Sequence, residues 1–335
     1  MESKDSANGA ASGLEADYAA VVGGAGVRIF GERKIVRVIG DDRVTFFHGM
    51  CSADVKGAAP GAILPALILT EHAHVIADLF IWVTDDALLL DIEAEAWSRA
   101  RAHLERLLVA DDVEFEDELE LSIIDVEGPK AAAAVQLVAG EALSLEKIWS
   151  HNGKTSAKTS ETIEMIVGRM PRYGAPAFSV IVPSATAASI VASMIDQMPA
   201  VRLIDATVTE IIRVENGIAR IGVDTTDKTI ALEARLNRAI SFNKGCYVGQ
   251  ETIERATARG ALKKRLRGLG LESIAERGAV VSLQGKEVGR LSSVAWSPRF
   301  GAIALAILHH SAWTPGTRVS IADSGGATVS DLPFA

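Results

Sequence analysis

Residues 242–251 read FNKGCYVGQE and place a cysteine between two glycines in a chain of 335 residues. Cys246 comes two residues after Lys244 and shortly before an amphipathic stretch, residues 250–258, that predicts a helix. A helix N-terminus and a nearby ammonium group both favour a thiolate over a thiol. The segment therefore predicts a reactive cysteine. A buried structural thiol is the commoner fate of an unpaired cysteine and stays the alternative.

The first part of the chain carries alternating and amphipathic patterns that predict a mixed α and β region. Apolar runs at 75–83 and 87–92, separated by Thr-Asp-Asp, predict a hairpin. An amphipathic helix over 93–109 follows, and a further strand is expected over 119–126.

A second set of elements follows in the same order. Residues 163–167 and 178–182 predict paired strands, and 184–198 a helix with Ser184 as its N-cap. The polar residues 151–160 predict a loop. The order strand-strand-helix-strand-strand-helix thus occurs twice before residue 200, a structural repeat without sequence identity.

The two ends of the chain differ from this region. Beyond residue 262, short strands alternate with Gly-rich turns and predict a small β-barrel or sandwich, with a domain boundary near that residue. Residues 1–17 are small, polar and acidic, which predicts a disordered N-terminus rather than a targeting segment.

Charge and composition exclude several classes of protein. The chain carries 34 Lys and Arg against 43 Asp and Glu, a formal net charge of −9 that disfavours binding of bulk nucleic acid. One basic run, residues 263–267, is interpreted as the solvated face of a strand, with contact to RNA or an acidic partner as the alternative. Two cysteines exclude a disulfide framework and favour a reduced, cytoplasmic protein. No apolar run is long enough for a membrane helix.

The motif and three further segments resemble a known superfamily. Residues 244–251, KGCYVGQE, are similar to the signature of the YgfZ family of folate-binding proteins, relatives of the aminomethyltransferase T proteins of glycine cleavage. Residues 38–49, 213–222 and 293–305 are similar to the opening strand and helix, the R-x-E-x-G-x-x-x-x-G element and the end barrel of that superfamily. The resemblance implies an α+β fold. An intertwined, duplicated ββαβββα-type folate-binding region of two lobes would occupy 18–262, and a small C-terminal β-barrel 263–335, with the three lobes in a ring.

Two departures favour the YgfZ branch over a glycine-cleavage enzyme. The aminomethyltransferases carry an Asp-Asp pair where this chain has Ala77-Asp78, so one acid remains. They also carry R-x-G-Y-x-G-E-x-G-F-E, which corresponds to residues 169–179 here. Arg172 replaces the tyrosine and Ser179 the final glutamate, both of which help to hold folate in the transferases.

The resemblance also implies a set of site residues. Cys246 would be the working thiol, and tetrahydrofolate or a one-carbon derivative would be bound by Asp78, Arg169, Arg213, Glu215, Lys244, Tyr247 and Gln250. The Asp78 carboxylate could accept two hydrogen bonds from the pterin ring, or it could be a surface-facing strand residue. Arg213 could contact folate or form an ordinary ion pair. His72 and His74 have no third ligand at a suitable spacing, so no metal site is expected.

Three functions fit these patterns. The first is a folate-binding protein that supports assembly or repair of iron–sulfur enzymes through Cys246, acting as a monomer with iron–sulfur client proteins or assembly factors as partners. Two cysteines cannot hold a cluster alone, so such contact would be transient or shared. The second is a folate-dependent aminomethyl or methyl transferase, and the third is a binding module with a vestigial pocket.

Overall fold

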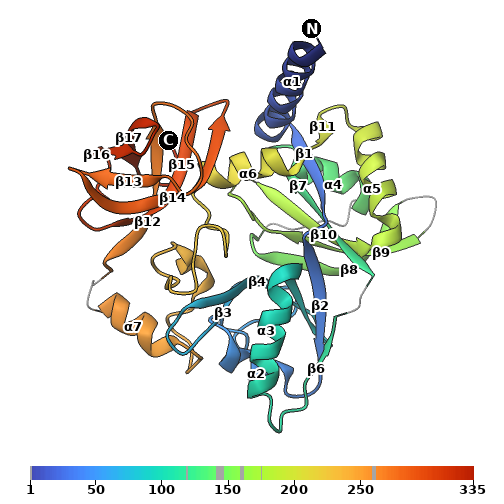
Figure 1. Cartoon of the computed structure of the whole chain (residues 1–335). Coiled ribbons are helices and arrows are strands. Elements are labelled where there is room, and N and C mark those ends of the chain that lie inside the picture. The colour runs from blue at the N-terminus through green and yellow to red at the C-terminus, as the bar shows by residue number, and fades with distance from the viewer. Residues whose placement is uncertain (1, 118–119, 141–146, 159–161, 175, 259–261) are drawn as a thin grey trace. The chain divides into compact units, whose positions relative to one another are not determined.

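The computed structural model describes residues 2–117, 120–140, 147–158, 162–174, 176–258 and 262–335 (Figure 1). The chain divides into two compact units, each made of several segments. The first contains residues 1–49, 53–66 and 79–208, and the second contains residues 50–52, 67–78 and 209–335.

The predicted duplication is present, with the element order ββαβββα in both copies. The first copy consists of β1 (Ala25–Phe30), β2 (Arg33–Ile39), α2 (Arg43–Met50), β3 (Ile63–Leu69), β4 (Val75–Val83), β5 (Leu88–Glu93) and α3 (Ala94–Leu107). The second consists of β6 (Glu114–Glu116), β7 (Leu121–Glu127), α4 (Ala131–Ala139), β8 (Ser150–Lys158), β9 (Thr162–Arg169), β10 (Ala177–Pro183) and α5 (Ser184–Gln197). The predicted hairpin is confirmed as β4 and β5.

The copies are intertwined because each gives its first strand to the sheet of the other. One sheet has the order β3-β4-β5-β2-β6, and the other β11-β1-β7-β10-β9-β8, where β11 is Val201–Leu203. Strand β1 pairs antiparallel with β7, and β6 pairs antiparallel with β2. This exchange explains why a division of the chain at a single residue does not separate the lobes.

The second sheet buries one face under α4 and α5, which lie beside each other in Figure 1. Both helices turn small or branched apolar side chains toward the strands, as their 3.6-residue spacing requires. The resulting core contains Ala134, Val138, Ile190, Met194 and Val180, all of them buried. Burial of such side chains stabilises the lobe by roughly 1.5–3 kcal/mol for each large one.

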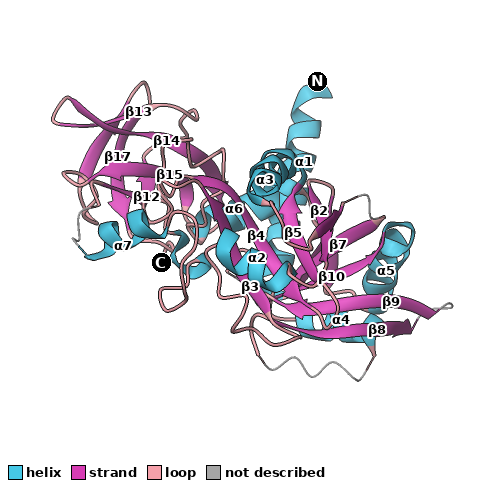
Figure 2. Ribbon diagram, turned by 90° about the horizontal axis from the view of Figure 1, so that it is seen from below, coloured by secondary structure: helices cyan, strands magenta, loops and turns pink. Residues whose placement is uncertain are grey.

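The polar loop predicted for residues 151–160 was wrong over its described part. These residues form most of β8, which pairs with β9 from Ser150 to Lys158, and the two strands run side by side in Figure 2. Strand β8 is the last strand of its sheet. An edge strand tolerates polar residues because one of its edges faces solvent, so it lacks the apolar pattern used to recognise strands. Residues 159 and 160 lie outside the described residues.

Two further expectations differ from the structure. Helix α1 (Glu2–Gly23) occupies the segment expected to be disordered, and it is Ala-rich, which favours helix formation. Its C-terminal part is anchored by Tyr18 and Val21, which are buried. Ser184 is the first residue of α5 rather than its cap, because Pro183 occupies the N-cap position and no side chain caps the helix.

The second unit holds α6 (Ala206–Glu215), the 3-10 turn η1 (Leu236–Ala239), α7 (Gln250–Ala258) and a closed barrel. Six strands form the barrel: β12 (Lys264–Leu271), β13 (Val280–Leu283), β14 (Lys286–Ser297), β15 (Gly301–His309), β16 (Arg318–Ile321) and β17 (Gly325–Ser330). They confirm the predicted C-terminal barrel. Within the described part of the chain, no helix is both long and apolar enough to span a membrane.

Candidate functional site

The cysteine motif forms a loop fixed from both sides by its own polar groups. Lys244 Nζ donates to the backbone oxygen of Cys51 at 2.8 Å and lies 4.9 Å from the centre of the Tyr247 ring. The backbone N–H of Tyr247 donates to Gln250 Oε1 at 3.2 Å, and the N–H of Gln250 donates back to the Tyr247 oxygen at 3.2 Å. Three of the predicted site residues therefore hold the loop in shape around Cys246.

The two cysteines have opposite environments. Cys246 is exposed, whereas Cys51 is buried and only 1% exposed. The exposed thiol lies four residues before the first residue of α7, as the predicted helix requires. The ammonium of Lys244 is engaged by the Cys51 carbonyl and the Tyr247 ring. That the Lys244 charge makes Cys246 more reactive stays a prediction. The structure shows that Cys246 is exposed.

Gly249 joins this loop to the turn between β3 and β4. Its φ of +88° lies in the region that favours glycine. A Cβ at this position would lie 2.7 Å from the Thr70 oxygen and 3.2 Å from the Leu69 Cβ. The motif therefore packs directly on the turn that leads into the strand of Asp78.

Asp78 lies on β4 and is partly buried. Its neighbours along the strand, Ala77 and Leu79, are fully or almost fully buried. No hydrogen bond or ion pair to the Asp78 carboxylate is found among the described residues. A carboxylate held at the border of the core without a protein partner is available to accept hydrogen bonds from a ligand.

The side chain of Tyr247 is buried. Burial, and then the nearby acids Glu254 and Cys51, raise the pKa of its phenol to about 12. The hydroxyl therefore stays protonated at physiological pH and acts as a hydrogen-bond donor or acceptor rather than as a base.

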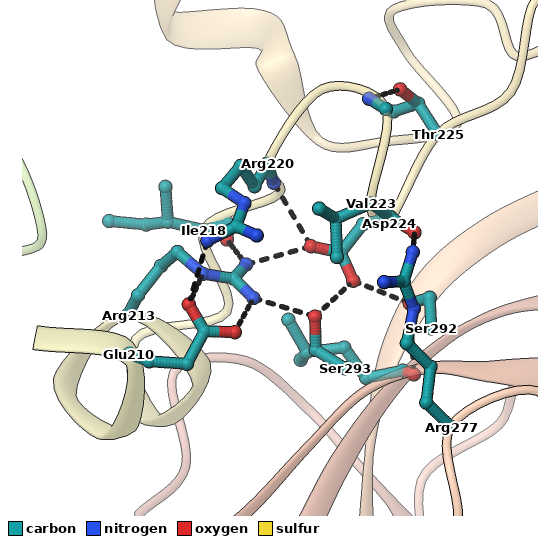
Figure 3. A network of polar contacts seen from close by, with 12 residues as sticks. Glu210, Arg213, Ile218, Arg220, Val223, Asp224, Thr225, Arg277, Ser292 and Ser293 are labelled. Carbon is teal, nitrogen blue, oxygen red and sulfur yellow. Dashed lines mark hydrogen bonds and ion pairs between the residues drawn. The ribbon is translucent and has the colours of Figure 1, made fainter. Parts of the chain in front are cut away.

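Arg213 is the centre of a polar network in the second unit, shown in Figure 3. Its Nε and Nη2 donate to the two carboxylate oxygens of Glu210 at 2.9 and 2.6 Å. Nη1 donates to Asp224 at 2.7 Å and to the Ile218 carbonyl, and Nη2 also donates to Ser293 at 2.6 Å. A guanidinium has five N–H donors, so the protein itself uses all of them.

A β-bulge explains how the barrel joins this network. The register of β14 against β15 shifts between Leu291 and Ser293. Consecutive strand residues normally point to opposite faces. Because of the bulge, the hydroxyls of Ser292 and Ser293 both donate to Asp224 Oδ1. Arg213 and Asp224 therefore tie α6 to the barrel, which is the ion-pair alternative considered for Arg213, and a folate contact for it stays a prediction.

Glu215 ends α6 and is also used internally. Its side chain is buried, and Oε1 accepts a hydrogen bond from the Ser297 hydroxyl. Its role in folate binding likewise stays a prediction.

In the first unit, the two residues that depart from the transferase pattern form a buried ionic cluster. Arg172 donates to Asp91, which also accepts from Arg33, and Arg172 Nε lies 3.8 Å from Asp125 Oδ1. Ser179 donates to Asp125. Burial alone would raise the pKa of Asp91, but the charges of Arg172 and Arg33 outweigh burial and lower it. The replaced side chains are therefore part of a structural network within this unit.

Glu127 is a further buried acid in this unit, and it was not among the predicted site residues. It shares a face of β7 with Asp125, two residues away, and both are buried. Burial, and then the negative charge of Asp125, raise the pKa of Glu127 well above its usual range. The signal was present in the sequence, since Asp91, Asp125 and Glu127 all interrupt or end apolar strand patterns in the way that Asp78 does.

Three further features were compared with the predicted site: Arg169, a cavity in the first unit, and the His72 and His74 pair. Arg169 ends β9 in the first unit, whereas the remaining predicted site residues belong to the second. A cavity of about 880 Å³ in the first unit is lined by Thr84, His151 and Ile166 among others, and by none of the predicted residues. His72 and His74 lie on the β3–β4 turn with ring centres 6.1 Å apart. No group of three His, Cys, Asp or Glu suited to a metal occurs in the described part of the chain.

Comparison with known proteins assigns this architecture to a class. The chain resembles the aminomethyltransferase T of the glycine cleavage system from Bartonella henselae, with a TM-score of 0.85 and 20% identity over 96% of this chain and 89% of that one. The fold is therefore that of an aminomethyltransferase. The GCVT N-terminal domain matches residues 6–244 and the glycine cleavage T-protein C-terminal barrel domain matches residues 264–335. This chain belongs to the GCVT family.

Two relatives show the range of the family. A putative chloroplastic transferase of Arabidopsis thaliana is 26% identical over 304 residues, which cover 89% of this chain and 68% of the relative. An aminomethyltransferase of Rubrobacter xylanophilus is 28% identical over 301 residues, which cover 88% and 79%. Each alignment covers at least 88% of this chain and therefore includes residues of both matched domains.

Proposed function

We propose that this chain binds a reduced folate through Asp78 and acts as a folate-dependent aminomethyl or methyl transferase. The observation that carries the proposal is the partly buried Asp78 carboxylate, which has no partner among the described residues of a GCVT-family protein. Two adjacent oxygens of a carboxylate match the N–H and amino donors on the edge of a pterin ring. The named relatives, a putative transferase and aminomethyltransferases, support transfer chemistry.

The residues of this chain would bind and orient rather than supply a covalent step. Asp78 would fix the pterin ring, and the loop of Lys244, Tyr247 and Gln250 would define the surface beside it, since Gly249 packs on the turn that leads into β4. Tetrahydrofolate, when bound, would accept the one-carbon unit from an aminomethyl or N-methyl substrate. This division of roles assigns the specificity to the pocket and the chemistry to the cofactor.

Titration with tetrahydrofolate and its one-carbon derivatives, with turnover followed in parallel, tests this proposal. Turnover of an aminomethyl or N-methyl donor that depends on folate and is lost in Asp78→Ala is expected. Asp85→Ala, in the exposed turn of the same hairpin, is the matched control and should bind and turn over normally. Binding without turnover of any such donor would refute the transferase and leave the second candidate.

The exposed thiol of Cys246 favours that second candidate, a member of the YgfZ branch. The protein would then bind folate and support assembly or repair of iron–sulfur enzymes through Cys246, as a cytoplasmic monomer that meets client proteins or assembly factors transiently. The supporting observations are the KGCYVGQE motif and the accessibility of its sulfur. Cys246→Ser should abolish maintenance of iron–sulfur enzyme activity in cells that lack the native protein, whereas Cys51→Ser should not. Full complementation by Cys246→Ser would show that the sulfur is not needed.

A further inference from the structure

A cavity of about 580 Å³ in the second unit is lined by three arginines. Arg265 and Arg267 come from the basic run at the start of β12, and Arg235 comes from the residue before η1. Trp313 also lines the cavity, and none of its described lining residues is acidic. Its volume falls in the range of small-molecule sites.

Arg267 is buried, although the basic run 263–267 was predicted to be the solvated face of a strand. Its side chain is only 9% exposed, and Nη1 donates to Asp331 at 2.6 Å. The Asp331 side chain is 69% exposed, so it neutralises Arg267 from the solvent side. The buried Nε of Arg267 has no hydrogen-bond partner among the described residues. Such a donor favours an added acceptor, because an unmet buried N–H destabilises the protein.

Arg235 is placed in the cavity by an unusual backbone conformation. Its φ of +61° is left-handed, a conformation that is unfavourable for a residue other than glycine. Nη2 donates to the Leu332 carbonyl at 2.8 Å. Burial, and then the like charge of Arg267, lower the pKa of Arg235 below its ordinary value. Strain of this kind is concentrated at functional sites.

Arg265 is oriented by an aromatic ring. Its guanidinium carbon lies over the Trp313 ring, 5.0 Å from the ring centre, a cation–π distance. The N–H groups of a guanidinium donate in pairs to phosphate or carboxylate oxygens. The three arginines carry three positive charges, and Asp331 offsets one of them.

We propose that this cavity binds a small polyanion, a ligand with at least two negatively charged phosphate or carboxylate oxygens. The ligand would accept from Arg235 and Arg265, next to the buried charge of Arg267. Neither Asp78 nor a residue of the cysteine motif lines this cavity, and the proposal does not depend on folate binding. The whole chain has a net charge of −9, so the positive charge of this cavity is a local feature and not part of a generally basic protein.

Calorimetric titration of the full chain with pyrophosphate and with citrate tests the proposal and distinguishes a phosphate ligand from a polycarboxylate ligand. Binding of pyrophosphate alone assigns a phosphate ligand, and binding of citrate alone assigns a polycarboxylate. Arg235→Gln and Arg265→Gln should each weaken binding by about tenfold or more, the loss of a charge-assisted hydrogen-bond pair. Arg318→Gln is the matched control, because it removes the same charge from an exposed barrel position.

A thermal-shift measurement keeps the test informative if a variant is less stable. The anion that binds should raise the melting temperature of the wild-type protein and of Arg318→Gln, and raise it less in the two cavity variants. Absence of binding of both anions at millimolar concentration would overturn the proposal, as would equal weakening in Arg318→Gln. Salt-sensitive retention of generic RNA that the cavity variants lose, without binding of either anion, would also overturn it and assign a nucleic-acid surface instead.

Discussion

Substitution of Gly249 by alanine isolates the contact that joins the cysteine motif to the turn before Asp78. Two costs add at this position. A side chain at a φ of +88° costs roughly 1–2 kcal/mol. A Cβ placed 2.7 Å from the Thr70 oxygen adds roughly 1–3 kcal/mol of overpacking, because a backbone atom cannot simply rotate away. The free energy of unfolding should therefore fall by about 2–5 kcal/mol.

Gly278→Ala separates these two costs. Gly278 has a φ of +90°, and a Cβ there would meet no atom within 4 Å, so only the backbone cost of roughly 1–2 kcal/mol applies. Urea denaturation of both variants measures the difference, and tetrahydrofolate titration under folding conditions measures the consequence at Asp78. Equal destabilisation of the two variants, or unchanged folate binding in a folded Gly249→Ala protein, would refute the packing of the motif on this turn.

Three further predictions concern charge and reactivity. Burial and the charge of Asp125 raise the pKa of Glu127, so the stability it contributes is present below the unfolded value of 4.5 and is lost as pH rises through its folded value. Glu127→Gln cannot lose a proton, so its free energy of unfolding should rise relative to that of the wild type between pH 5 and pH 8. The difference is about 1.4 kcal/mol for each unit by which the fold raises the pKa of Glu127. The exposed variant Glu120→Gln should show the same pH dependence as the wild type. Exposed Cys246 should react with iodoacetamide more than about tenfold faster than buried Cys51 in the folded protein, and a similar rate for both would contradict its accessibility. Despite the basic run at 263–267, duplex DNA and generic RNA should not be retained at physiological salt, as a filter-binding assay would show.

Two kinds of element were predictable. The β4–β5 hairpin is buried along almost all of its length, and two apolar runs on either side of a Thr-Asp-Asp turn indicate it. Helix α7 and the barrel strands have one apolar face that must be covered, and the spacing of their apolar residues indicates that face. Strand β8 was missed because a sheet edge does not need such a face. The exchange of β1 and β6 between sheets was expected only from the resemblance, since pairing between distant strands leaves no local pattern.

The members of the candidate site stay predictions, and the sequence indicated little of their contacts. The motif around Cys246 predicted a reactive thiol, and the structure shows that this residue is exposed. Sequence alone could not show that all five N–H donors of Arg213 bind protein acceptors. Two of these acceptors, Asp224 and Ser293, lie on a loop and at a β-bulge, which leave no periodic pattern. Nor could it show that Arg267 and Arg235 line the same cavity. Arg235 lies 32 positions before Arg267, and its place in the cavity depends on its left-handed backbone conformation.

The most direct test of the central claim is calorimetric titration of tetrahydrofolate into the wild-type protein, Asp78→Ala and Asp85→Ala. Removal of the carboxylate leaves the pterin donors unpaired, which costs about 1–3 kcal/mol. Binding to Asp78→Ala should therefore be weakened by roughly five- to 150-fold, while Asp85→Ala binds as the wild type does. Absence of binding to the wild-type protein at millimolar tetrahydrofolate, or equal affinity of Asp78→Ala and wild type, would contradict the assignment of Asp78 as the folate-binding residue.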